Sequence, residues 1–272
     1  MSSANLTSMR IGAVTYLNSR PLIENLELLL PDADLRLDYP SRLADALAAE
    51  RLDVALIPSV EYLRRPGYEI ISDACVAARG EVMSVKLYCR VHPGQVRRLA
   101  LDEGSRTSAV LARVILAERY GAHPETESLR MEAATEDTAA DAVLLIGDRA
   151  MHSPIEHFAE VMDLGQVWND WTGLPFVFAM WVARSAAHTE GVDEVLCMAR
   201  DQGIANIAGI ARREAPKLGL SETVAFHYLT RNLHYHLTSA ERSGLRLFFE
   251  LASQHQLVET HVDIVFRDLV PA

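Results

Sequence analysis

Two polar stretches stand where a predicted strand gives way to a predicted helix. The first runs from Tyr16 to Leu22 and contains Asn18, whose amide is both a donor and an acceptor. The second consists of Ser105, Arg106, Thr107 and Ser108. Free N–H groups at a helix start attract anions, so both stretches are candidates for binding a carboxylate. Plain helix capping is the alternative at both places.

Two further polar residues lie near predicted strand ends. Ser84 begins a predicted strand and shares a face with Lys86, so its hydroxyl faces either a ligand or the solvent. Asp148 follows a buried strand, and Gly147 before it indicates a tight turn or the close approach of another group. Asp148 is therefore a candidate binding residue, with helix capping as the alternative.

An aromatic-rich segment, residues 168–181, is a candidate wall for an apolar pocket. It contains Pro175, a further candidate for substrate binding, although core and hinge packing is the alternative. The ten histidines form no ligand set, and the HExxH, GxSxG, P-loop and GxGxxG motifs do not occur in the sequence. We therefore expect neither a metal nor a cofactor.

Strand and helix patterns alternate in a way that is typical of parallel sheets covered by helices. Strands are predicted at Arg10–Val14, Asp34–Tyr39, Asp53–Ile57, Arg98–Leu101, Ser128–Met131 and Ala142–Ile146. Helices are predicted from Pro21, from Ser41 to Arg51, from Pro58, and from Thr107 to Tyr120. After Ala183 helical spacing continues to about Gln256 and includes His234 and His236. Ligands bind such sheets at the carboxyl ends of the strands.

Two longer strands are predicted at Met83–Val91 and Pro175–Ala183. We expect both to cross between two lobes as a hinge, which gives a two-lobed Venus-flytrap α/β fold with its ligand in the cleft. The first lobe is expected to be discontinuous, residues 9–90 plus 185–272, and the second to be inserted, residues 91–184. Residues 1–8 are expected to be a disordered tail.

The acidic composition limits the partners. The 272 residues carry a net charge of −11, which argues against nucleic-acid binding because that requires a basic face. No secretion signal is visible, and no run approaches the roughly 20 apolar residues of a membrane span. Cys75, Cys89 and Cys197 indicate buried thiols in a reducing compartment. We expect a cytoplasmic protein with no nucleic-acid or membrane partner, and the oligomeric state stays open.

The order and content of several segments resemble the futalosine-pathway chorismate dehydratases of menaquinone biosynthesis. The segments are VTYLNSRPL (14–22), EVMSVKLYCR (81–90), SRTSAVLARVIL (105–116), LLIGDRAM (144–151), DLGQVWNDWTGLPFVFAMW (163–181) and FHYLTRNLHYHL (226–237). The resemblance implies a type 2 periplasmic-binding-protein fold and a hydro-lyase acting on chorismate. It also implies catalytic roles for Asn18 and Ser84, and a carboxylate-binding loop at residues 105–108.

Three alternatives remain. A non-catalytic solute-binding protein for a small carboxylate has the same fold, and the missing secretion signal argues against it. The sister 1,4-dihydroxy-6-naphthoate synthase typically begins with a Ser-Pro-Cys-Pro-Asn-Asp-like loop, whereas this chain has Tyr16 to Pro21 there. A ligand-sensing regulatory domain would need a preceding pair of DNA-binding helices, which the sequence does not show.

Overall fold

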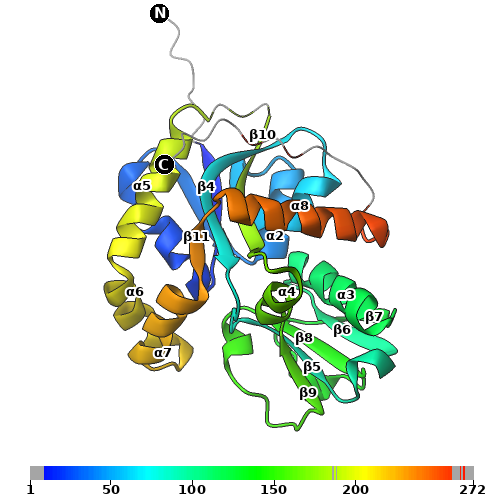
Figure 1. Ribbon diagram of the computed structural model, residues 1–272. Helices are drawn as coiled ribbons and strands as arrows, with labels where there is room; N and C mark the ends of the chain where they lie inside the picture. Colours follow the sequence, from blue (N-terminus) through cyan, green and yellow to red (C-terminus); the bar gives the residue numbers. More distant parts are fainter. Residues whose placement is uncertain (1–8, 186, 188, 259–263, 265, 267–272) are drawn as a thin grey trace, which may run out of the picture.

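The computed structural model describes residues 9–258 except 186 and 188, together with residues 264 and 266. The tail expected at residues 1–8 lies outside this part of the chain. The described residues form two lobes, each built on its own sheet (Figure 1). The lobe made by the inserted segment is largely green in the figure, and the other contains both the blue and the orange segments. The expected two-lobed α/β architecture is therefore confirmed.

The first lobe is built on a six-stranded sheet with the order β11-β4-β10-β3-β1-β2. Its strands are β1 (Arg10–Val14), β2 (Asp34–Asp38), β3 (Val54–Pro58), β4 (Tyr68–Ala78), β10 (Phe176–Arg184) and β11 (His234–His236). β1 pairs in parallel with β2 and β3, while β10 runs antiparallel between β3 and β4. β3 is a continuous buried apolar run, and β1 is one from Ile11 onward, as central strands covered on both faces require.

The second lobe is built on a five-stranded sheet with the order β7-β6-β8-β5-β9. Its strands are β5 (Val85–Cys89), β6 (Arg98–Asp102), β7 (Glu125–Leu129), β8 (Ala142–Ile146) and β9 (Glu160–Asp163). β7 begins earlier than the strand predicted at Ser128–Met131. β9 was not predicted, because only Met162 of its four residues is buried and so no alternating pattern marks it.

Helices cover both sheets and join the lobes. They are α1 (Leu26–Leu29), α2 (Pro40–Ala48), α3 (Thr107–Tyr120), α4 (Leu164–Thr172), α5 (Val192–Ala205), α6 (Ile207–Glu214), α7 (Glu222–His227) and α8 (Ser239–Gln254). Two 3-10 helices, η1 (Leu17–Ile23) and η2 (Ser59–Arg64), take the places of the helices expected from Pro21 and Pro58. α8 belongs to the first lobe and contacts α3 of the second (Figure 1).

The two hinge strands differ from expectation. β5 pairs only within the second sheet and β10 only within the first, so neither strand spans both lobes. The chain instead crosses in residues 79–84 and 173–175. The predicted strand Met83–Val91 starts late because Met83 has a φ of 61° and its N–H donates to Asp163 (2.7 Å). We propose lobe boundaries inside these two crossing segments, in place of residues 90/91 and 184/185.

The prediction of helix after Ala183 was wrong at the start, because α5 begins only at Val192, and again at β11. Residues 234–236 form β11, which pairs with β4, and there Tyr235 is buried while His234 and His236 are half-buried. β4 itself was not predicted, although it pairs with both β11 and β10 and has eleven residues. Ser72 and Asp73 interrupt its apolar run, and their partners are distant in sequence: Ser72 lies 3.5 Å from Cys197, and Asp73 accepts from Arg200.

Candidate active site

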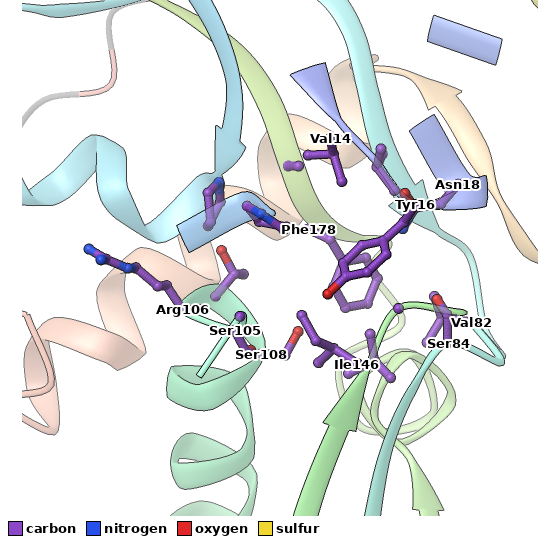
Figure 2. A pocket seen from close by; sticks show the side chains of 18 residues that line it. Val14, Tyr16, Asn18, Val82, Ser84, Ser105, Arg106, Ser108, Ile146 and Phe178 are labelled. Carbon is purple, nitrogen blue, oxygen red and sulfur yellow. The ribbon is translucent and has the colours of Figure 1, made fainter. Parts of the chain in front are cut away.

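A pocket between the two lobes collects most of the candidate residues. Asn18, Ser84 and residues 105–108 all line it, together with Tyr16, Gly147 and Phe178 (Figure 2). The pocket holds about 530 Å³ of atom-free space, and this volume includes space open to solvent. The remaining walls are apolar side chains from both sheets, including Val14, Val76 and Ile146.

Asn18 reaches the pocket from η1, directly after β1. Its Oδ1 is buried and has no hydrogen-bond partner among the described residues. A buried amide oxygen without a partner costs free energy, roughly 1–3 kcal/mol. The arrangement therefore leaves an acceptor ready for a group that enters the pocket.

Ser84 lies at the end of the first crossing segment, and a tyrosine holds it. The Tyr228 hydroxyl donates to Ser84 Oγ at 2.8 Å, and both side chains are buried. Burial raises the pKa of Tyr228 well above its ordinary value. Tyr228 opens a single π-helical turn, η7 (Tyr228–Asn232), a geometry that is frequent at functional sites. The sequence does not mark Tyr228, because an aromatic residue at helical spacing indicates core packing, although residues 226–237 belong to the resemblance.

The start of α3 supplies backbone donors. The Ala109 N–H donates to Ser105 Oγ (3.2 Å), and the Val110 N–H donates to the Arg106 carbonyl. The first N–H groups of a helix have no partner within the helix. In the described chain this leaves the N–H groups of Thr107 and Ser108 at the pocket, where they suit a carboxylate.

The side chains around these donors have different partners. Thr107 Oγ1 accepts from the Val60 N–H (3.2 Å), so this hydroxyl ties α3 to the first lobe. The Arg106 guanidinium pairs with Asp45 (2.7 Å) and Glu61 (3.2 Å) of the first lobe and points away from the pocket (Figure 2). Ser108 faces the pocket.

Two candidates lie outside the pocket. Asp148 accepts the backbone N–H of Leu17 at 3.0 Å, a contact from the second lobe to the first, and burial raises its pKa to about 6. The Pro175 carbonyl accepts the indole N–H of Trp168 at 3.2 Å within the second crossing. Neither residue lines the pocket with the others.

Tyr16 closes one side of the pocket. Its ring packs on Gly147, where an added Cβ would lie 2.6 Å from the ring, and an added Cβ on Gly104 would lie 3.3 Å from its hydroxyl. The close approach predicted from Gly147 is therefore confirmed. Because Tyr16 comes from the first lobe and both glycines from the second, the ring fills the gap between the lobes. Burial raises the pKa of Tyr16.

The described residues contain no group of three or more His, Cys, Asp or Glu side chains that is arranged to hold a metal ion. Cys75, Cys89 and Cys197 are free thiols. In the described part of the chain no helix is long and apolar enough to span a membrane.

Solved structures share the fold. Protein AF1704 from Archaeoglobus fulgidus superimposes with a TM-score of 0.69 at 15% identity, covering 94% of this chain and 100% of its own. The periplasmic aliphatic sulphonate binding protein SsuA from Escherichia coli superimposes with a TM-score of 0.59 at 16% identity, covering 94% and 95%. These likenesses confirm the type 2 periplasmic-binding-protein-like fold.

Sequence comparison is more specific. The chain is 34% identical over 261 residues to the chorismate dehydratase of Thermus thermophilus, covering 88% of this chain and 93% of that one. It is 28% identical over 177 residues to the chorismate dehydratase of Campylobacter jejuni, covering 63% and 66%. A family model described as menaquinone biosynthesis matches residues 9–254. This chain belongs to that menaquinone biosynthesis family.

Proposed function

We propose that this chain is a chorismate dehydratase, which converts chorismate to 3-[(1-carboxyvinyl)oxy]benzoate and water. One observation carries the proposal: a single interlobe pocket brings together Asn18, Ser84 and the start of α3. These groups suit a small dicarboxylate with one hydroxyl that must leave. The relatives named chorismate dehydratase support the same activity.

The chemistry requires the loss of one proton and one hydroxyl from adjacent ring carbons. The proton leaves the carbon that bears the enolpyruvyl ether, and its electrons form the new ring double bond as the neighbouring hydroxyl departs. The proton and hydroxide together make water, so the atoms balance without an oxidant or a reductant. Formation of the aromatic ring drives the reaction, and we therefore propose that no cofactor takes part.

The start of α3 stabilises the charge that develops as the proton leaves. The carbon that loses this proton is joined to the ring carboxylate through a ring double bond. Negative charge that develops on this carbon therefore spreads into the carboxylate in the transition state. The N–H groups of Thr107 and Ser108 are donors at a helix start and would hold this carboxylate. Ser105 supports them by capping the Ala109 N–H. We assign Arg106, Asp148 and Pro175 to lobe closure rather than to direct contact.

The base is the side-chain carboxylate of the substrate itself. No His, Asp or Glu is among the described residues that line the pocket, and burial raises the pKa of Tyr16 above its ordinary value. Holding the enolpyruvyl carboxylate beside the ring proton would replace an enzyme base by geometry. Asn18 and Ser84 orient the substrate and form hydrogen bonds with the leaving hydroxyl or the side-chain carboxylate.

We place this activity in the cytoplasm, without nucleic-acid or membrane partners. The net charge of −11 and the three free thiols support this placement.

The test mixes purified protein with chorismate, without added metal or cofactor, and follows product by chromatography and mass spectrometry. We expect 3-[(1-carboxyvinyl)oxy]benzoate from the wild type. Asn18→Ala and Ser84→Ala, each shown to be folded, should lose at least a hundredfold in kcat/KM, because a pre-placed hydrogen-bond partner is typically worth that much.

Three outcomes separate the alternatives. Full activity in both variants would remove Asn18 and Ser84 from the mechanism. No product, with chorismate still stabilising the fold, would favour a binding protein. Neither product nor binding would favour the sister synthase, which is then tested with cyclic dehypoxanthine futalosine.

A further inference from the structure

We infer that Tyr228 is a positioning residue that turns the Ser84 hydroxyl into a donor directed at the pocket. The inference deepens the proposed function and rests on it. It also specifies what the pair of Asn18 and Ser84 recognises, which is a hydroxyl group of the ligand.

The hydrogen bond between the two hydroxyls runs from Tyr228 to Ser84. Tyr228 donates to Ser84 Oγ at 2.8 Å, and the side chains are 0% and 1% exposed, so water does not compete. A serine hydroxyl has one hydrogen and accepts through its lone pairs. Because Tyr228 occupies an acceptor position, the Ser84 hydrogen remains free, and no described residue accepts a hydrogen bond from it. It is therefore available to a ligand in the pocket that Ser84 lines.

Hydrogen bonds from both lobes hold Ser84 and Tyr228 in place. The π-helical turn η7 bonds to the first crossing segment at both of its ends, through Tyr228 to Ser84 and through Asn232 Nδ2 to the Glu81 carbonyl (3.0 Å). From the other lobe, Asp163 accepts the N–H groups of Val82 and Met83. The segment needs this support because Met83 has a positive φ of 61°. The position of Ser84 is thus fixed from both lobes.

Asn18 supplies a hydrogen-bond acceptor to the same pocket. Its side chain interacts with the Tyr228 hydroxyl, while its Oδ1 is buried without a partner among the described residues. The pocket therefore presents one donor, from Ser84, and one acceptor, from Asn18, which both line it (Figure 2). An alcohol both accepts and donates, so it satisfies the two together. In chorismate the ring hydroxyl that leaves has this character, and a donor on its oxygen assists departure as negative charge develops there.

The chain contains a matched control for this tyrosine. Tyr235 of β11 is also buried, at 3% exposed, but its hydroxyl has no hydrogen-bond partner among the described residues. Tyr235→Phe and Tyr228→Phe make the same chemical change. Only Tyr228→Phe removes a hydrogen bond to Ser84.

The experiment measures kcat and KM for chorismate with Tyr228→Phe, Tyr235→Phe, Ser84→Ala and the double variant Tyr228→Phe/Ser84→Ala, each shown to be folded by urea unfolding. We expect Tyr228→Phe to lower kcat about tenfold to a hundredfold, less than the loss of a direct donor, with KM within about twofold. Tyr235→Phe should match the wild type. The double variant should be no slower than Ser84→Ala, since Tyr228 acts through Ser84.

A merely structural role would give multiplied losses in the double variant or an equal effect of Tyr235→Phe, and either result overturns the inference. Wild-type activity in Tyr228→Phe also overturns it while leaving the proposed function intact. If the wild type itself makes no product from chorismate, the proposed function fails, and the role of Tyr228 on this substrate fails with it.

Discussion

Single residues decide how closely the lobes approach at the pocket. Gly147 has a φ of 69° and a ψ of −157°, a region open essentially to glycine alone. The Tyr16 ring occupies the space where a side chain would stand. Backbone freedom and close approach therefore require glycine at this one position.

We expect Gly147→Ala to lower the free energy of unfolding by about 2–5 kcal/mol, from backbone strain plus steric overlap with Tyr16. The control is Gly121→Ala at the end of α3, where φ is 64° and nothing lies within 4 Å of an added Cβ. That change should cost only about 1–2 kcal/mol. Urea unfolding measures both, and equal losses would show that the contact with Tyr16 is unimportant.

At the scale of elements, the start of α3 has two tasks that the sequence could not separate. Its backbone N–H groups lie at the pocket, whereas Thr107 Oγ1 and the Arg106 guanidinium bond to the first lobe. Ser105 to Ser108 all line the pocket, and local spacing alone marks them as a helix start. The partners of the side chains lie 45 to 61 residues away and follow only from packing.

Arg106→Gln distinguishes a lobe contact from a substrate contact. Partly exposed ion pairs contribute about 0.2–1 kcal/mol, so we expect KM for chorismate to rise no more than about fivefold, with kcat nearly unchanged. Direct pairing with a substrate carboxylate would instead be worth roughly 2–5 kcal/mol, at least thirtyfold. Arg36→Gln removes an exposed ion pair with Asp38 inside one lobe and is the control, expected to leave KM unchanged.

At the scale of the whole molecule, we expect stability to be linked to protons through Asp148. This side chain of the second lobe accepts the Leu17 N–H of the first, and burial raises its pKa to about 6. An aspartate in an unfolded chain has a pKa near 3.9. Between about pH 4 and pH 6 the folded state therefore binds more protons than the unfolded state, and the contribution of this group to stability falls as pH rises.

Asp148→Asn should remove that pH dependence. The amide keeps an oxygen that can accept from Leu17 but does not titrate in this range. We expect the unfolding free energy of the wild type, minus that of the variant, to decrease from pH 4 to pH 7. Urea unfolding across this range measures the difference. Asp34→Asn, at an exposed position of β2, is the control, and a constant difference for Asp148→Asn would contradict the linkage.

The sequence alone determined the alternation of strands and helices and the two-lobed architecture, because these follow from local patterns. Local spacing marked Asn18, Ser84 and residues 105–108 only as candidates, with helix capping or solvent exposure as the alternative, and the family resemblance favoured a role in the site. Tertiary structure alone decided where the chain crosses between the lobes, that residues 234–236 form a strand, and that Tyr228 holds Ser84. The physical reason is the separation of the partners along the sequence. Ser84 and Tyr228 are 144 residues apart, and a hydrogen bond between residues so far apart in sequence depends on packing that no local pattern records.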